Sequence, residues 1–252
     1  HKNDFQERMM DSNPIERERG ITIKMQPVRM RYEYQGENYI LNLIDTPGHV
    51  DFHYEVSRSL AAWEGALLLV DATQGIQAQT LANLLIAQRH NLTIVPVVNK
   101  IDLPNAEPEK VSLELAHLLN CDPGTVIPIS AKTGEGVKQV IDAIIETIPS
   151  PKRTSDQPLQ ALIFDSQFNT YRGVVTHVRI VNGSIKTGDR ITFMATGYTC
   201  TAEEVGYMTI DYHVGEELCA GEIGYVVTGL KEVRQCRVGD TITGAGRPAV
   251  SP

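Results

Sequence analysis

The sequence predicts an α/β domain with a mostly parallel sheet and helices on both faces, followed by a small β-barrel. Three observations support this prediction. Between residues 65 and 148, apolar runs of strand length alternate with segments of helical periodicity, the pattern of a parallel sheet. Residues 148–158 hold three prolines and no apolar periodicity, as an extended linker does. Only short strand-like runs separated by turn signals follow, and these favour a barrel.

The expected elements follow from the apolar pattern. Residues 28–32 and 39–44 flank a turn at 35–38 and predict a hairpin. Beyond the hairpin, the expected strands of the first domain are 65–71, 92–98 and 125–129, and its expected helices are 54–63, 77–90, 107–119 and 137–148. The clearest barrel strands are 159–164, 173–180, 190–193 and 224–227. We therefore expect a first domain at 1–148, a linker at 149–158 and a barrel domain at 159–252.

Composition limits the class of protein. A chain of 252 residues that is 42% hydrophobic can bury a core in one or two domains. Its net charge of −8 differs from the basic surface of a protein that grips nucleic acid over its whole area, so any RNA contact is expected to be local. The sequence has no 18-residue apolar stretch and opens on no signal segment, which predicts a cytoplasmic location.

The run Asp-Thr-Pro-Gly-His at 45–49 follows the apolar residues 39–44 and places a carboxylate at the end of a strand. In nucleotide hydrolases an aspartate in this position holds Mg²⁺, here expected through a water molecule. Gly48 has no side chain, so its N–H can approach a γ-phosphate. His49 is the candidate for positioning the attacking water, in preference to a surface loop histidine.

The run Asn-Lys-Ile-Asp at 99–102 follows a second apolar strand, and Ser-Ala-Lys at 130–132 follows a third. The Asp102 carboxylate can accept both N–H donors of a guanine edge. Asn99 is expected to tie neighbouring loops and face the base, and the stem of Lys100 to lie on the ring plane. An isolated match to this motif is commonly a surface turn, but the preceding strand and the Ser-Ala-Lys run favour a guanine site.

Residues 19–23, Arg-Gly-Ile-Thr-Ile, precede the hairpin, and Thr22 supplies a hydroxyl that could bind Mg²⁺. Such a segment orders when the γ-phosphate is present and relaxes after hydrolysis. No GxxxxGK[ST] phosphate loop occurs in the sequence; in this order of elements it is expected upstream of Thr22, before His1. We favour loss of the phosphate loop from this chain over a degenerate nucleotide site, because the other residues expected to face the phosphates are present.

Residues 19–23, 45–52 and 99–102 resemble those of a translational GTPase. Further segments resemble one family of translational GTPases in particular, elongation factor 4, the LepA family. They are residues 54–60, residues 164–166 with 171–174, and residues 221–225 with 237–241. The resemblance covers nearly the whole chain and implies a P-loop-type G domain followed by a translation-factor barrel. His53 and Trp63 depart from the smaller residues expected there, which affects packing detail.

The resemblance implies a ribosome-dependent GTPase of translation elongation that promotes back-translocation and fidelity. GTP or GDP and Mg²⁺ would be its cofactors, and its partners would be ribosomal RNA and proteins and, through domains beyond this chain, ribosome-bound tRNA. Ile21 would form half of a hydrophobic gate beside His49. A monomer in the cytoplasm is expected, with the organellar matrix or the periphery of the inner membrane as alternatives.

Residues predicted to bind GTP are Asp45, Thr46, Pro47, Gly48, His49, Asn99, Lys100, Ile101, Asp102, Ser130, Ala131 and Lys132. Predicted metal ligands are Thr22 and Asp45, and the predicted switch and gate residues are Ile21 and Thr22. Two alternatives stay open. The first is another ribosomal GTPase of translocase or BipA type, which residues 54–60 disfavour. The second is a catalytically inactive module that keeps the fold as an adaptor.

Overall fold

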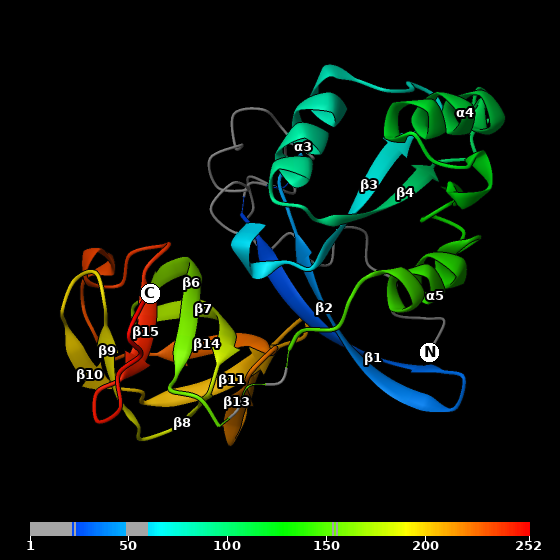
Figure 1. Cartoon of the computed structure of the whole chain (residues 1–252). Coiled ribbons are helices and arrows are strands. Elements are labelled where there is room, and N and C mark those ends of the chain that lie inside the picture. The colour runs from blue at the N-terminus through cyan, green and yellow to red at the C-terminus, as the bar shows by residue number, and fades with distance from the viewer. Residues whose placement is uncertain (1–21, 23, 49–59, 153, 155) are drawn as a thin grey trace. The chain divides into compact units, whose positions relative to one another are not determined.

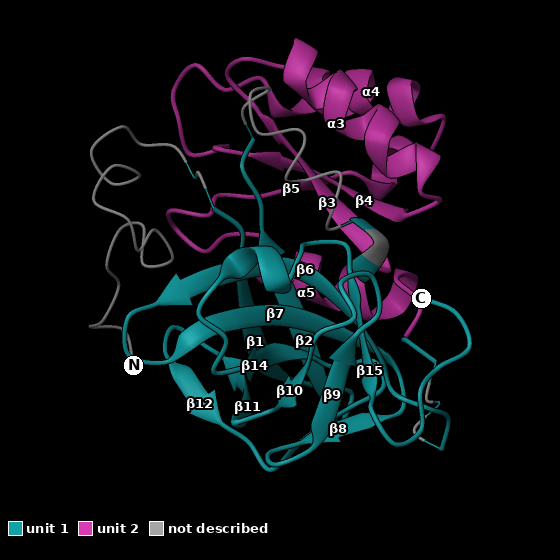
Figure 2. Ribbon diagram, turned by 90° about the vertical axis from the view of Figure 1, so that its left-hand side faces the viewer, with its two compact units in different colours: residues 1–62, 151–252 teal, residues 63–150 magenta. Residues whose placement is uncertain are grey.

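The structure, a computed structural model, describes residues 22, 24–48, 60–152, 154 and 156–252. The chain divides into two compact units, residues 1–62 with 151–252 and residues 63–150, coloured separately in Figure 2. Each unit has its own buried core. Within the described residues no helix is long and apolar enough to cross a membrane.

The unit of residues 63–150 is built on a parallel sheet in the order β3-β4-β5 (Figure 1). Its strands are β3 (Gly65–Asp71), β4 (Thr93–Asn99) and β5 (Ile127–Pro128). Its helices are α3 (Ala78–Arg89), α4 (Pro108–Leu119) and α5 (Val137–Thr147), with a short 3-10 helix η3 (Pro123–Thr125). The register of β3 and β4 runs from Gly65 opposite Thr93 to Asp71 opposite Asn99, so both strands end at one edge of the sheet.

Helices cover both faces of this sheet, as predicted. Successive residues of a strand point to opposite faces. Accordingly, Val98 of β4 packs with Val111 and Leu115 of α4. Its neighbour Val97 belongs to a second cluster, which contains Val140 of α5. Apolar residues on both faces of β4 explain why its sequence is a continuous apolar run.

Most expected elements are confirmed to within two residues, but β5 is shorter than the expected strand 125–129. The preceding residues form η3, where Asp122 Oδ1 accepts a hydrogen bond from Gly124 N at 2.7 Å. Pro128 has no N–H to donate to a neighbouring strand. Most of the helix expected at 54–63 lies outside the described residues, and its described end is a 3-10 helix, η2 (Leu60–Ala62).

The hairpin is confirmed as β1 (Gln26–Tyr34) and β2 (Glu37–Asp45), paired antiparallel. Gln35 and Gly36 both have positive φ, 51° and 82°, which is the backbone of the two-residue turn that matches strand twist. Among the described residues the hairpin is a separate two-stranded sheet and belongs to the same compact unit as the barrel. In the described part of the chain, the parallel portion of the predicted sheet is therefore β3-β4-β5.

Arg29 of β1 fixes the hairpin within its unit. One guanidinium nitrogen lies 3.0 Å from Glu222 Oε1 and donates to the Ile223 carbonyl at 3.2 Å. The guanidinium carbon is 4.4 Å from the centre of the Tyr207 ring. Charge, hydrogen bonding and ring contact on a side chain that is only 11% exposed make this a specific contact.

The barrel is formed by one curved eight-stranded sheet in the order β10-β9-β15-β6-β7-β14-β11-β12 and a small sheet, β13-β8 (Figure 1). Its strands are β6 (Gln160–Asn169), β7 (Gly173–Asn182), β8 (Ser184–Lys186), β9 (Arg190–Phe193), β10 (Thr199–Thr201), β11 (Glu204–Met208), β12 (Tyr212–Val214), β13 (Glu217–Cys219), β14 (Ile223–Val227) and β15 (Thr241–Gly244). A 3-10 helix, η4 (Val233–Gln235), precedes β15. The buried core draws Ile163, Ile180, Phe193, Leu218 and Ile242 from five different strands.

Gly206 of β11 shows how tightly the barrel is packed. A Cβ atom placed there would overlap the His213 carbonyl oxygen and lie 2.7 Å from the Tyr225 hydroxyl. Tyr225 is fully buried, and its hydroxyl donates to Glu204 Oε1 at 2.7 Å, so the ring cannot move aside freely. Gly215 lies nearby without such crowding, because the nearest atom to its Cβ position is 3.5 Å away.

We predict that Gly206→Ala lowers the free energy of unfolding of the barrel by about 2 kcal/mol through overpacking. The matched control Gly215→Ala is expected to change it by less than about 0.5 kcal/mol. Amide hydrogen exchange in β11 and β14 measures the difference. Equal effects of the two substitutions would contradict the packing argument.

Candidate functional site

The loops that follow β3, β4 and β5 meet at one edge of the parallel sheet. Asp71 and Asn99 are register partners at the ends of their strands, and Ala72 N donates to the Asn99 carbonyl at 2.8 Å. On the other side, Ile129 N donates to the Val98 carbonyl at 2.7 Å. The carboxyl edge of a parallel sheet is the usual place for a ligand in such folds.

Asn99 joins two of these loops. Its Oδ1 accepts from Lys100 N at 2.7 Å and from Ala131 N at 3.0 Å. This contact is the loop tie expected of Asn99 from the sequence. Contact of the same residue with a base stays a prediction.

Ser130 holds the side chain of Asp102. The serine is fully buried, and its hydroxyl donates to Asp102 Oδ1 at 2.7 Å while accepting from Thr133 N at 3.1 Å. Asp102 itself is exposed, and its second oxygen has no hydrogen-bond partner among the described residues. The serine therefore orients the carboxylate and leaves Oδ2, together with the second lone pair of Oδ1, able to accept further hydrogen bonds.

The turn after Ser130 depends on a glycine. Gly136 has φ of 72°, and a Cβ atom there would overlap the Pro128 carbonyl oxygen. Ser130 N donates to the Glu135 carbonyl at 3.0 Å, which closes the loop before α5 begins. Ala131 and Lys132 are exposed on this loop.

Lys100 and Ile101 point to different surroundings. Lys100 has φ of 68°, in the left-handed region that few residues with side chains adopt, and it is exposed. Ile101 packs against the core beside α4, and its N–H donates to the Ile129 carbonyl at 3.3 Å. The Lys100 side chain thus faces solvent, whereas the Ile101 side chain anchors the loop to the core.

The amino group of Lys100 lies 2.6 Å from Asp71 Oδ2. Asp71 Oδ1 accepts from Thr73 N at 2.8 Å and from the Thr73 hydroxyl at 2.7 Å. Partial burial raises the pKa of Asp71, but the hydrogen bonds from Lys100 and Thr73 outweigh it, so the pKa lies below its usual value. Sequence reasoning did not select Asp71; its only signal was a carboxylate at the end of an apolar run.

The predicted phosphate-side residues belong to the other unit. Asp45 is the last residue of β2, opposite Gln26, and it is half-buried, as are Thr46 and Thr22. Pro47 is buried, whereas Gly48 is exposed and has no atom within 4 Å of a Cβ position. Ile21 and His49 lie outside the described residues.

The donor chemistry of this segment fits Mg²⁺. The described residues contain no group of three or more His, Cys, Asp or Glu side chains arranged for a metal. Mg²⁺ bound with a nucleotide needs only one or two protein oxygens, since phosphates and waters fill the other positions. The Asp45 carboxylate and the Thr22 hydroxyl are oxygens of the required kind.

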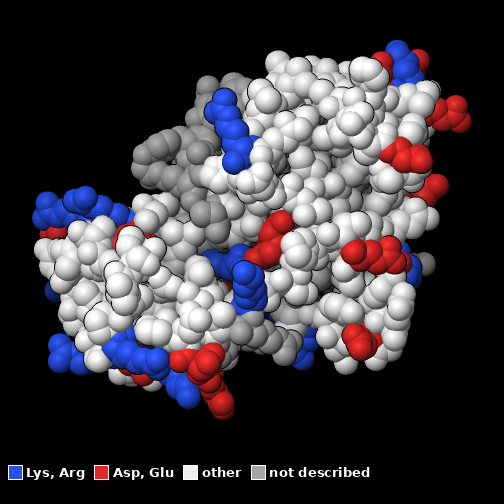
Figure 3. All heavy atoms as spheres, viewed as in Figure 1, with Lys and Arg blue, Asp and Glu red and all other residues white. Residues whose placement is uncertain are grey.

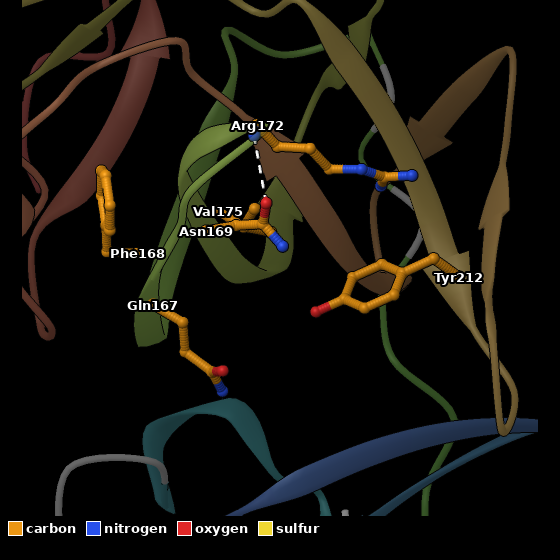
Figure 4. Close-up of a pocket in the computed structure, with 6 residues that line it drawn as sticks. All are labelled: Gln167, Phe168, Asn169, Arg172, Val175 and Tyr212. Atoms are coloured by element: carbon orange, nitrogen blue, oxygen red, sulfur yellow. Dashed lines mark hydrogen bonds between the residues drawn. The ribbon is translucent and has the colours of Figure 1, made fainter.

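The barrel carries a hollow of about 260 Å³ that contains none of the predicted site residues (Figure 4). It is lined by Gln167, Phe168, Asn169, Arg172, Val175 and Tyr212. Beside the lining residue Tyr212, the buried His177 has Nδ1 3.1 Å from Asp165 Oδ2 and Nε2 3.4 Å from the Tyr212 hydroxyl. Both polar atoms of this histidine are used in holding the barrel wall.

The chain belongs to the family of the elongation factor Tu GTP binding domain, whose model matches residues 1–150. The model of elongation factor Tu domain 2 matches residues 173–243. These matches define a translational GTPase G domain followed by a domain 2 barrel, as the sequence predicted.

The individual relatives are named elongation factor 4. That of Christiangramia forsetii is 56% identical over 243 residues, 96% of this chain and 41% of the relative. That of Thermobifida fusca is 58% identical over 241 residues, 95% of this chain and 39% of the relative. The resemblance to elongation factor 4 is confirmed, and the chain spans about two fifths of the length of these relatives.

Two solved structures share the fold. The bacterial selenocysteine-specific elongation factor EF-Sec superposes with a TM-score of 0.77 at 21% identity, over 93% of this chain and 40% of that chain. Elongation factor SelB from Methanococcus maripaludis, in complex with the GTP analogue GppNHp, superposes with a TM-score of 0.71 at 24% identity, over 88% of this chain and 50% of that chain.

We predict that Ser130→Ala lowers the free energy of unfolding of the unit of residues 63–150 by about 1.5 kcal/mol, because the Thr133 N–H and the Asp102 carboxylate lose a buried partner. Thr147→Ala removes an exposed hydroxyl from α5 and is expected to change it by less than about 0.5 kcal/mol. Hydrogen exchange in β4 and α5 measures both. A Ser130 variant as stable as the Thr147 variant would show that the buried hydroxyl is unimportant.

Proposed function

We propose that this chain is the G domain and second domain of a ribosome-dependent GTPase of translation elongation, of the elongation factor 4 type. The observation that carries the proposal is the pair of contacts Asn99–Ala131 and Asp102–Ser130, which joins the predicted base-binding residues at one sheet edge. The relatives named elongation factor 4 support it further.

In this proposal Asp102 selects guanine. Its carboxylate accepts the N1–H and the exocyclic amine of the base, a pattern that adenine does not offer. Ser130 keeps the carboxylate aimed, and the stem of Lys100 covers one face of the ring. The backbone of Ser130, Ala131 and Lys132 faces the base oxygen. A site built to pair with such donors rejects analogues that lack them by large factors.

On the phosphate side, Thr22 and Asp45 would hold Mg²⁺, with Asp45 acting through water. Bound Mg²⁺ would neutralise charge on the β- and γ-phosphate oxygens. Gly48 offers its N–H to the γ-phosphate without steric hindrance. Loss of the γ-phosphate then releases the segment around Thr22, which gives partners two states to distinguish.

We assign His49 the role of orienting the attacking water, with Ile21 as part of a hydrophobic gate beside it. An imidazolium near phosphate has no free nitrogen lone pair and cannot act as a base, but it is a good hydrogen-bond donor and charge stabiliser. Engagement by ribosomal RNA would bring His49 toward the γ-phosphate. Intrinsic hydrolysis is therefore expected to be slow and ribosome-stimulated hydrolysis fast.

The proposed partners are ribosomal RNA and proteins, and the proposed setting is the cytoplasm, with a monomeric protein. On the face seen in Figure 3, Lys and Arg side chains form separate small groups and no single continuous basic surface, which suits local rather than extended RNA contact. We also propose the domain limits 1–148 and 159–252, with residues 149–158 as the linker. Among the described residues of that linker no helix or strand occurs.

Two other functions would use the same fold. Another ribosomal GTPase, of translocase or BipA type, would share the nucleotide chemistry and act on a different ribosomal state. An adaptor would keep the fold without binding nucleotide. The retained Asp102–Ser130 contact favours a nucleotide-binding protein, because a surface loop has no need of a buried serine to aim an exposed carboxylate.

We predict that the 252-residue chain binds GTP weakly or not at all, whereas a longer chain with a phosphate loop upstream of Thr22 binds GDP and GTP with micromolar or lower Kd. The physical reason is that the backbone N–H groups and lysine of that loop hold the α- and β-phosphates. Isothermal calorimetry on both proteins provides the measurement. Failure of the longer chain to bind either nucleotide would rule out the GTPase and favour the adaptor.

In the full-length protein, His49→Ala is expected to keep nucleotide affinity and lose ribosome-stimulated hydrolysis by at least about 100-fold, since it removes a group that acts on the transition state. The control is His90→Ala, at the exposed C-terminal end of α3. Phosphate release with and without ribosomes measures the effect. Loss of GDP binding in the His49 variant would instead indicate a structural role.

A further inference from the structure

We propose that Asp71 is a specificity-determining residue: it holds the ammonium group of Lys100 away from Asp102, so that the Asp102 carboxylate stays available to guanine. This inference rests on the proposed function of the Asn99–Asp102 loop. It assigns a role to a residue that lies outside the predicted motifs, at the end of the neighbouring strand β3. Asp71 acts through Lys100 and is not itself expected to touch the base.

Asp71 is built to keep one position. Its side chain is 18% exposed, and Oδ1 is fixed by the N–H and the hydroxyl of Thr73. Oδ2 accepts from Lys100 Nζ at 2.6 Å and from Gln74 Nε2 at 3.4 Å. The strand register places Asp71 directly opposite Asn99, one residue before Lys100. Position and orientation are thus set by the sheet and by a local turn.

Lys100 and Asp102 would otherwise be natural partners. They stand two residues apart on one loop, with opposite charges, and the lysine stem is long and freely rotating. In the structure each has a different partner: Lys100 pairs with Asp71, and Asp102 accepts from Ser130. The arrangement keeps the Lys100 ammonium group apart from the Asp102 carboxylate. If the two groups paired, the carboxylate would no longer be available to guanine.

The consequence concerns discrimination more than stability. Lys100 is 51% exposed, so its ion pair with Asp71 contributes little to folding. A lysine that swings to Asp102, however, offers an N–H donor at the place where guanine offers its own. That donor would compete with the exocyclic amine of guanine and would favour xanthine, which carries an oxygen at the same ring position. Specificity is a difference between two affinities, and Asp71 affects them unequally.

The test uses the full-length protein and compares Kd values for GDP and XDP. Asp71→Asn keeps an oxygen for the two Thr73 donors and replaces Oδ2 with an uncharged amide that cannot hold an ammonium group. We expect GDP binding to weaken about tenfold and the ratio of GDP to XDP affinity to fall by about the same factor or more. Glu107→Gln is the matched control, because it removes the carboxylate of an exposed ion pair with Lys110 in the same unit.

A second variant separates positioning from structural support. In the background Lys100→Met, which has no ammonium group to misplace, Asp71→Asn is expected to leave the GDP to XDP ratio unchanged. An equal loss of both affinities in Asp71→Asn, or the same fall in the ratio in the Lys100→Met background, would overturn the inference. An unchanged ratio in Asp71→Asn would also overturn the inference. In each of these cases, normal GDP binding by the unsubstituted protein would leave the proposed function standing. Absence of GDP binding by the unsubstituted protein would refute the proposed function itself.

Discussion

The candidate base site depends on the parallel register of β3 and β4. Because seven residues of each strand pair in step, Asp71 and Asn99 end at the same edge of the sheet. The loops that carry Lys100, Asp102 and Ser130 start from that edge. Hydrogen bonds can therefore form directly between neighbouring loops. A register shift of one residue would turn the side chains of a strand to the other face and remove these contacts together.

Burial of a few polar groups gives this edge its rigidity. Ser130 is fully buried while the Asp102 carboxylate that it holds is exposed, so a fixed donor aims a solvent-facing acceptor. Asn99 joins the loops through backbone N–H groups, and Asp71 is held by Thr73. Such contacts cost little to make on folding but are costly to leave half-made in a buried setting. A site of this kind is preorganised toward its ligand.

Hydrogen bonds of buried polar side chains also stabilise the barrel. Tyr225 lies over Gly206 and donates to Glu204, and His177 is bonded from both sides within the wall. Arg29 of the hairpin meets Glu222 and Tyr207, so residues matched by the GTP-binding family model touch residues matched by the domain 2 model within one compact unit. The hairpin, which follows the predicted switch residue Thr22 and ends at the predicted metal ligand Asp45, is thereby connected to the barrel.

Sequence alone determined the elements whose apolar pattern matches a period: β3, β4, α3, α4 and α5 were predicted within two residues, because burial imposes that pattern directly. It also selected Asn99, Asp102 and Ser130, because polar residues that directly follow an apolar strand can be recognised from the amino-acid sequence. Only the tertiary structure decided that Lys100 pairs with Asp71, that β5 is short, and that the hairpin, among the described residues, is a separate two-stranded sheet in the same compact unit as the barrel. These features arise between residues distant in the chain, or from prolines and register, where local patterns carry no information about the partner.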